Sequence, residues 1–332
     1  MGRWKTMRRW GLRIILVALV LAAILAGIGW AWERSEEAAF VKAEFEPPGK
    51  MVKAGDQDLH VVIEGQGSPG ILLITGLGDD SRTWHKILDQ LSESTRVVSY
   101  DRPGLGWSPP TSSERTLEAA MKDIEHLLSD PDLFDGPPIL VGHSIGGMIA
   151  RHYAHAHPND ISGLIGIDPT PDKMPRVAKV PAVFNRVGAW LASAGLFRWQ
   201  YYQAHPDLTR EEKLQRGHIN ASGARWRAVD HEMQGAMNSG PVLEPQEGLG
   251  DLPFTIFVAS YEVPSFIRGA MAEINEVKRL MVEESTRSRL VELESDHYVH
   301  YDNPDTVVAE TLKMVADVRL ERATQAKTDS EH

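Results

Sequence analysis

The chain has 332 residues, of which 42% are hydrophobic and 24% charged, and this composition and length suit one large domain with an insertion or two domains. It contains no cysteine, which excludes disulfides, thiolate catalysis, cysteine-based zinc sites and a lipoprotein anchor. The formal net charge is −11 although five basic residues precede the first acidic one. The acidic body does not suggest a protein that binds nucleic acid.

An uninterrupted apolar run covers residues 14–32, after a basic flank at residues 1–13. Its 19 residues are long enough to cross a bilayer as a helix, which takes about 20. Trp10, Trp30 and Trp32 lie at its two ends, where interfacial aromatic residues are common. The basic flank predicts that the amino terminus stays in the cytoplasm. We therefore expect a single-pass anchor with the rest of the chain outside the cytoplasm.

The alternative is a cleaved signal peptide followed by secretion. The sequence Gly29-Trp30-Ala31 fits a small-x-small cleavage site. The apolar run is longer than the roughly 7–15 residues of a signal peptide, which favours the anchor. Residues 33–50 are charged and contain Pro47-Pro48-Gly49, so they are predicted to form a linker.

The body of the chain alternates predicted strands and helices. Residues 51–54 and 59–63 flank Gly55-Asp56 as in an antiparallel hairpin. Short apolar runs that are typical of buried parallel strands follow at 71–74, 97–100, 139–141, 164–167, 254–258 and 290–293. Helical patterns lie at 117–128, 145–157, 267–283 and 305–320. This order predicts an α/β fold with a doubly wound, mostly parallel sheet.

We expect this core to comprise residues 51–168 and 252–323, followed by a frayed polar tail at 324–332. Residues 169–251 separate two predicted strands and are too many for an ordinary crossover. Their helical stretches are rich in aromatic residues, which predicts a helical lid over the carboxyl ends of the strands. Most of these aromatic residues would pack the inserted helices together. A few that face a pocket would favour an apolar substrate.

The first candidate for chemistry is Ser144, within the sequence Gly142–Gly147 between a predicted strand and a predicted helix. This is the context that a nucleophile elbow requires. The turn is sharp and strained, so Gly142 and Gly146 fit where side chains would collide. The helix that follows places unpaired N–H groups and a positive partial charge beside the serine. A glycine-rich turn with an incidental serine is the alternative interpretation.

A serine hydroxyl needs a base that is oriented by a carboxylate. Among the thirteen histidines, His297 follows the last predicted strand and comes after Ser144 in the chain. A surface histidine is the alternative by position alone.

Three motifs together resemble the α/β-hydrolase fold superfamily over about residues 51–320. Asp101–Ser108 is similar to its D-x-x-G-x-G-x-S loop, and Gly142–Gly147 to its G-H-S-x-G-G elbow. Asp296 to Pro304 resembles its H-x-x-H…P signature, whose first histidine is the base. The resemblance implies a serine hydrolase with Ser144 as nucleophile and His297 as base. Serine at the elbow, where relatives such as epoxide hydrolases have aspartate, argues against their chemistry.

The resemblance also implies an oxyanion hole made by the backbone N–H groups of Leu77 and Ile145. The family often has His-Gly in the first of these loops, whereas this chain has Thr75-Gly76. Because the donors belong to the main chain, this change leaves the hole possible.

For the acid, the resemblance points to the loop after residues 254–258, where Glu262 takes the usual place of an aspartate. Asp168, at the end of the preceding strand, is the alternative position, and its other interpretation is a turn-forming residue before Pro169. We interpret Asp101 and Asp296 as residues that only structure their loops.

The predicted function is hydrolysis of a carboxylic ester with an apolar part, by a membrane-anchored enzyme. The alternatives are the same triad acting on an amide, thioester or carbon–carbon bond, or a catalytically silent scaffold used for binding. No metal-binding or nucleotide-binding motif is present, so no cofactor and no metal are expected. The expected partners are a small apolar substrate and, through residues 14–32, the membrane.

Overall fold

The computed structural model describes residues 2–172, 182–237, 239, 248–260, 263–265 and 268–330. The chain divides into two compact units. The smaller unit combines Met1–Glu46 with Ala182–Asp230, and the larger combines Pro47–Pro181 with His231–His332.

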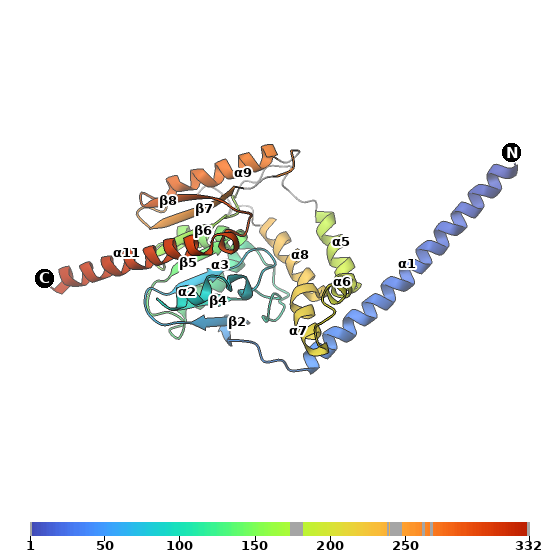
Figure 1. The fold of residues 1–332 in the computed structure, drawn as a ribbon, viewed down its shortest axis with the longest axis horizontal. Coiled ribbons are helices and arrows are strands. Elements are labelled where there is room, and N and C mark those ends of the chain that lie inside the picture. The colour runs from blue at the N-terminus through green and yellow to red at the C-terminus, as the bar shows by residue number, and fades with distance from the viewer. Residues whose placement is uncertain are drawn as a thin grey trace. The chain divides into compact units, whose positions relative to one another are not determined.

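The larger unit is built on a sheet of eight strands in the order β1-β2-β4-β3-β5-β6-β7-β8 (Figure 1). The pairs β1/β2 and β2/β4 are antiparallel, and the other neighbours are parallel. The predicted α/β fold with a mostly parallel sheet is confirmed. The strands are β1 (Lys50–Ala54), β2 (Gln57–Glu64), β3 (Ile71–Ile74), β4 (Val97–Tyr100), β5 (Ile139–His143), β6 (Gly163–Ile167), β7 (Phe254–Ser260) and β8 (Ser288–Glu294).

Helices cover both faces of this sheet, which is why its central strands are apolar throughout. All residues of β3, β4, β5 and β6 are buried. On one face pack α3 (Leu117–Ser129) and α4 (Ile145–Ala156), and on the other α2 (Leu88–Ser92) and α11 (Pro304–Ser330). Other described elements of this unit are the short helices η1 (Ser81–Trp84), η4 (Met281–Glu284) and α10 (Val299–Asp302), together with α9 (Arg268–Leu280).

The parallel register brings the carboxyl ends of the middle strands to one edge of the sheet. His143 of β5 pairs with Ile167 of β6, which in turn pairs with Phe257 of β7. The residues that follow β5 and β6 are Ser144 and Asp168, so the register places them next to each other.

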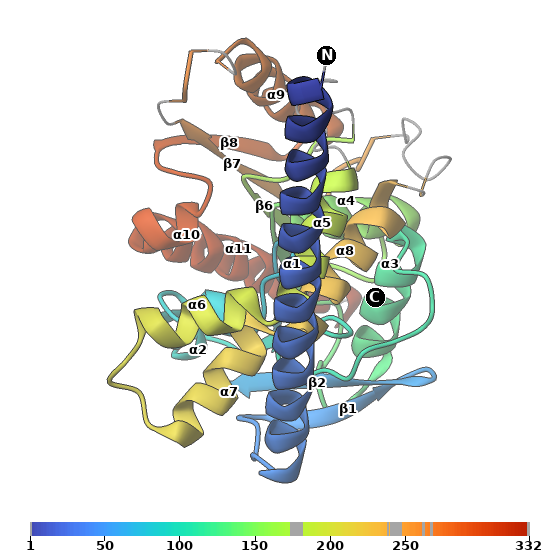
Figure 2. The ribbon, with the colours of Figure 1, turned by 90° about the vertical axis from the view of Figure 1, so that its right-hand side faces the viewer.

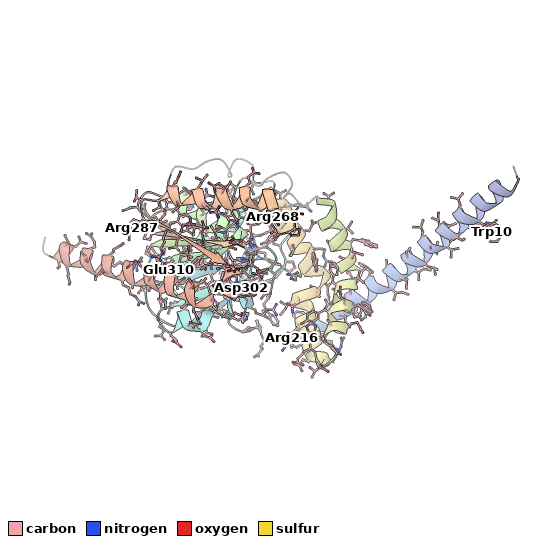
Figure 3. All side chains as sticks on the ribbon, turned by 45° about the horizontal axis from the view of Figure 1, so that its top comes forward. Trp10, Arg216, Arg268, Arg287, Asp302 and Glu310 are labelled. Carbon is pink, nitrogen blue, oxygen red and sulfur yellow. The ribbon has the colours of Figure 1, made fainter. Side chains whose placement is uncertain are left out.

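The smaller unit contains the long helix α1 (Gly2–Lys42), visible as one continuous rod in Figure 2. With it lie α5 (Ala182–Ser193), α6 (Leu196–Ala204), α7 (Arg210–Ala221) and most of α8 (Gly223–Met237). Among the described residues, Trp10–Lys42 is the one helical stretch long and apolar enough to cross a membrane. Its apolar side chains, including Trp10, project outward (Figure 3). This helix is a candidate membrane anchor or signal sequence.

Two boundary predictions are wrong. Residues 33–50 were expected to form a linker, but α1 continues to Lys42, because Glu33 and Glu36 are buried by ion pairs with arginines of α6 and α7. Residues 324–332 were expected to form a frayed tail, but α11 continues to Ser330. Polar side chains support its last turns, as in the hydrogen bond from Gln325 to Asp329.

The segment predicted as a lid, residues 169–251, contains α5, α6, α7 and α8 within its described part. The predicted insertion of helices is thus present. Their expected role as a cover over the strand ends stays a prediction.

Asp101, after β4, organises the loop that carries the D-x-x-G-x-G-x-S motif. Its carboxylate accepts hydrogen bonds from the backbone N–H groups of Ser81 and Trp107, at 2.6 and 2.9 Å. The Nδ1 atom of buried His60 lies 2.7 Å from the same carboxylate. Gly106 has a φ of 51°, and a Cβ there would lie 2.1 Å from Asp101 Oδ2. The interpretation of Asp101 as a loop-structuring residue is confirmed.

We expect Asp101→Asn to lower the melting temperature of the full chain in detergent, because it leaves His60 buried without its carboxylate. Breaking a buried pair costs about 3–5 kcal/mol. Burial raises the pKa of Asp101, but the hydrogen bond and charge of His60, together with the backbone N–H groups of Trp107 and Ser81, lower this pKa overall. For His60, burial lowers the pKa and the bond to Asp101 raises it above its ordinary value.

These directions set the pH range of the effect. The contribution of Asp101 is present above about pH 4 and is lost as the pH falls through its folded-state pKa, whereas that of His60 is present below about pH 6.5 and is lost as the pH rises. The difference between wild type and Asp101→Asn should therefore be largest between about pH 4 and 6.5. Asp58→Asn, at an exposed pair with Lys53, is the matched control. A pH-independent difference would contradict the expectation.

Candidate active site

Ser144 lies at the turn between β5 and α4 in a strained backbone conformation, with φ 54° and ψ −120°. Its N–H donates to the carbonyl of Ile167 at 3.1 Å. A Cβ at Gly142 would lie 2.4 Å from the carbonyl oxygen of Gly146, and a Cβ at Gly146 would lie 2.2 Å from that of Ile74. Side chains cannot occupy either position, so the two glycines allow the turn that exposes the serine.

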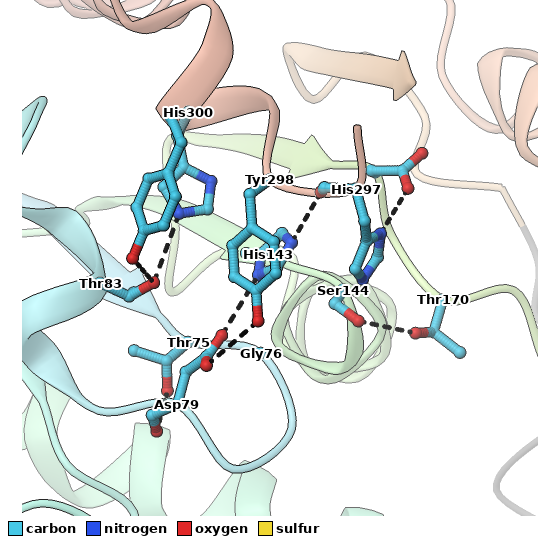
Figure 4. Close-up of polar contacts among 12 residues, drawn as sticks. Thr75, Gly76, Asp79, Thr83, His143, Ser144, Thr170, His297, Tyr298 and His300 are labelled. Carbon is cyan, nitrogen blue, oxygen red and sulfur yellow. Dashed lines mark hydrogen bonds and ion pairs between the residues drawn. The ribbon is translucent and has the colours of Figure 1, made fainter. Parts of the chain in front are cut away.

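His297 follows β8 on a loop, and its imidazole points toward Ser144 (Figure 4). Its Nδ1 atom lies 2.6 Å from Oδ2 of Asp168. A carboxylate only accepts hydrogen bonds, so the proton resides on Nδ1 and the Nε2 atom is left with a lone pair. This is the tautomer that a general base for Ser144 requires.

Asp168 follows β6 with a φ of 42°, and its side chain is buried. Its second oxygen, Oδ1, accepts hydrogen bonds from the backbone N–H of Ala259 at 3.0 Å and from Nζ of buried Lys278 at 2.6 Å. Burial raises the pKa of Asp168, but the bond from His297 and the charge of Lys278 outweigh burial and hold this pKa below its ordinary value. The carboxylate is therefore ionised at neutral pH.

This pairing corrects one interpretation and leaves another open. The view of Asp168 as only a turn-forming residue is wrong, because its carboxylate bonds to His297. Glu262, the residue expected to orient the histidine, lies outside the described residues.

The two expected oxyanion donors lie at the ends of β3 and β5. Ile145 is the first residue of α4, and Leu77 lies in the loop after β3. Neither N–H has a backbone acceptor among the residues that the structure describes. Their role as oxyanion donors stays a prediction.

Arg102 holds the loop before Leu77. Its guanidinium is fully buried and donates to the carbonyl oxygens of Thr75 and Gly76 at 2.6 and 2.7 Å. It also pairs with Glu232, in the part of α8 that belongs to the larger unit. Burial lowers the pKa of Arg102, but the charge and hydrogen bonds of the Glu232 carboxylate raise this pKa by more than burial lowers it. The arginine therefore stays charged. The D-x-x-G-x-G-x-S motif includes Arg102, but sequence reasoning assigned no role to this arginine or to Glu232.

His143, next to the serine, joins the elbow to the loop of the base. Its Nε2 atom donates to the carbonyl oxygen of His297 at 3.0 Å. The centroids of the His143 and His297 imidazole rings are 4.7 Å apart. Its Nδ1 atom lies 3.7 Å from Asp79, whose carboxylate also accepts from the hydroxyl of Tyr298 at 3.3 Å (Figure 4). His143 belongs to the elbow motif in the sequence. Its hydrogen bond to His297 could not be predicted there, because the two residues are 154 positions apart.

The second histidine of the H-x-x-H signature, His300, is buried against Trp84. Burial, together with neighbouring His143 and His297, places its pKa far below the ordinary value, so it is neutral. It has a packing role beneath the site. Asp296 accepts from the N–H of Tyr298 at 2.7 Å, which fits its interpretation as a loop-structuring residue.

Several buried apolar side chains lie beside Ile145. A small cavity of about 10 Å³ there is lined mainly by apolar residues, together with Arg115, Thr116 and Glu232. The apolar lining residues are Leu117, Ala120, Ile145, Met148, Ile149 and Ala236. Within the described part of the chain, no group of three or more His, Asp and Glu side chains could hold a metal ion.

Comparison with known proteins identifies the family of the chain. Residues 71–311 match the model of the alpha/beta hydrolase family. The chain is 23% identical to the uncharacterized protein YqjL of Bacillus subtilis over 246 residues, which are 73% of this chain and 82% of YqjL. It is 35% identical to the lipase LipV of Mycobacterium tuberculosis over 113 residues, 34% of this chain and 42% of LipV. The match thus spans less than half the length of LipV.

Among solved structures, the enol-lactonase from Burkholderia xenovorans has the same fold. Its TM-score is 0.60 at 20% identity, over 80% of this chain and all of the enol-lactonase.

We expect Gly146→Ala to reduce the turnover number by about 100-fold, because an added methyl group must displace the backbone of Ile74 and Thr75 beside the oxyanion loop. Gly269→Ala is the matched control, since a Cβ at this position in α9 meets nothing within 4 Å. Steady-state kinetics on a soluble ester, with melting temperatures, check the expectation. Equal activity of both variants would show that the close contact has no catalytic importance.

Proposed function

Because the chain belongs to the alpha/beta hydrolase family and is a hydrolase, we propose that it cleaves a carboxylic ester with an apolar part through Ser144, His297 and Asp168. The observation that carries the proposal is the hydrogen bond between His297 Nδ1 and Asp168 Oδ2, which leaves the other imidazole nitrogen to act as base.

In the first step, Ser144 Oγ attacks the ester carbonyl carbon while His297 Nε2 takes the hydroxyl proton. The N–H groups of Leu77 and Ile145 donate to the oxyanion that forms. As the intermediate collapses, the alcohol leaves with the proton from His297, and an acyl ester remains on Ser144. Water then attacks this ester with His297 again as base, and the carboxylic acid is released.

Asp168 stabilises the imidazolium that exists during both steps. Lys278 shares its carboxylate, which keeps Asp168 ionised but draws part of its negative charge away from His297. We assign the acid role to Asp168 rather than Glu262, and the hydrogen bond between His297 Nδ1 and Asp168 Oδ2 supports this assignment.

The apolar part of the substrate is proposed from the aromatic-rich sequence of residues 169–251 and from the likeness to a lipase. An ester as the scissile bond agrees with the names of a lipase and an enol-lactonase among similar proteins. The intact Ser144, His297 and Asp168 argue against a silent binding scaffold.

We further propose that α1 is an uncleaved anchor with a cytoplasmic amino terminus and an extracytoplasmic enzyme. The basic residues before the apolar run support this orientation. The helical continuation past the apolar run supports retention, because buried ion pairs tie α1 to α6 and α7. Cleavage after Ala31 would separate the apolar run from these contacts.

A fluorophosphonate probe should label the purified full chain, because it forms a covalent bond with an activated serine. Ser144→Ala should remove the labelling completely, whereas Ser113→Ala, in an exposed loop, should leave it unchanged. Mass spectrometry locates the modified residue. Equal labelling of the Ser144→Ala variant would disprove the assigned nucleophile.

Asp168→Asn should lower the turnover number by about 10⁴-fold, the loss seen when the acid of the chymotrypsin triad is replaced by its amide. Glu262→Gln is the matched control and should retain most of the activity. Both variants are assayed on the same p-nitrophenyl ester, with folding checked by circular dichroism. If Glu262→Gln loses the activity and Asp168→Asn keeps it, the acid is Glu262.

A further inference from the structure

The smaller unit exposes a group of large apolar side chains on α5 and α6. Trp190 is 60% exposed and Trp199 55%, and Val187 and Leu196 are exposed as well. Val187 and Trp190 are three residues apart, as are Leu196 and Trp199, so each pair lies on one face of its helix. Single exposed apolar side chains are normal on a protein surface, whereas several large ones together mark a site of interaction. The two exposed tryptophans on neighbouring helices therefore indicate that this surface binds a partner.

These helices are held firmly against α1. Arg198 of α6 is fully buried and forms a two-pronged ion pair with Glu33, at 2.7 and 2.8 Å. Glu33 also accepts the backbone N–H of Gly223 at 2.8 Å. A Cβ at Gly29 would lie 2.1 Å from the carbonyl oxygen of Ala194, so the turn between α5 and α6 touches the backbone of α1.

Further polar contacts continue along α1 beyond its apolar run. Glu36 pairs with Arg210 and accepts from the hydroxyl of Tyr202 at 2.7 Å. Phe40 stacks on His218 with ring centroids 3.8 Å apart. The charged contacts thus begin at Glu33, where the apolar run ends.

The contact with α5 begins inside the apolar run. An open groove of about 510 Å³ is lined by Ala26, Gly27 and Trp30 of α1 and by α5 residues that include Trp190. The distance along α1 from Ala26 to the last apolar residue, Trp32, is about 9 Å at 1.5 Å per residue. The groove therefore lies at the level of the last turns of the apolar run, with the ion pairs just beyond it.

We propose that α5 and α6 dock on the lipid bilayer that α1 crosses, with Trp190, Trp199, Val187 and Leu196 in the interfacial layer of the leaflet from which α1 emerges. This inference rests on the proposed membrane anchor. If residues 14–32 occupy the hydrocarbon, α5 is held at the depth where tryptophan side chains are favoured. The apolar faces of α5 and α6 then meet lipid, and the charged contacts lie on the water side.

The absence of cysteine in the chain allows a direct test with single-cysteine variants. Trp190→Cys, Leu196→Cys and Trp199→Cys are each labelled with a nitroxide in the full chain and reconstituted into phosphatidylcholine/phosphatidylglycerol vesicles. Collision rates with oxygen, which partitions into the bilayer, are compared with those of a water-soluble nickel chelate. Leu19→Cys, in the apolar run, gives the reference ratio for a side chain in the bilayer. Arg216→Cys, at an exposed position of α7, gives the reference ratio for a side chain in water.

The expected result is an oxygen-to-nickel ratio at residues 190, 196 and 199 several-fold above that at residue 216 and approaching that at residue 19. Ratios equal to that at residue 216, with residue 19 still in lipid, would overturn the docking while the anchor stands. A water-like ratio at residue 19 would overturn both. Low collision rates with both reagents, together with spin–spin broadening that unlabelled protein relieves, would show that a second copy of the chain covers this face and would likewise overturn the proposal.

Discussion

The carboxylate of Asp168 is the point from which the active site is organised. One oxygen accepts from Nδ1 of His297, the proposed base, and the other accepts from Lys278 and from the main chain of β7. A buried carboxylate with this many donors stays charged and cannot rotate. The loop of the base and the ends of two strands are therefore held by a single side chain.

The serine depends on a second constraint, which is steric. The turn at Ser144 is strained, and it persists because the backbone of α4 packs directly on the end of β3 with no side chain between them. The same packing brings Ile145 beside the loop of Leu77. Arg102 then completes the loop by binding two of its carbonyl oxygens. The proposed nucleophile and oxyanion donors thus share one rigid contact.

The smaller unit is held together differently. Buried ion pairs join its helices, and two of these helices carry exposed apolar side chains. The side chains of Glu33 and Arg198 are both buried. Any other helix in the place of α6 would leave Glu33 as a buried charge without a partner, which is strongly destabilising. The pair therefore specifies that α6 lies against α1. Trp190 and Trp199 are exposed on the helices that these pairs attach to α1. Helix α1 is therefore a structural part of the smaller unit, whether or not its apolar run anchors the protein in a membrane.

The sequence by itself determined the α/β fold, the positions of the strands along the chain and the elbow motif at Ser144, because apolar periodicity and glycine spacing are local signals. It also located His297, since that residue lies in a family motif. Only the tertiary structure related Asp168 to His297 and identified Lys278, Arg102 and Glu232, because these contacts join residues far apart in the chain. It likewise decided that α1 extends past its apolar run, because the charges of Glu33 and Glu36 resemble a solvated linker until their arginine partners are known.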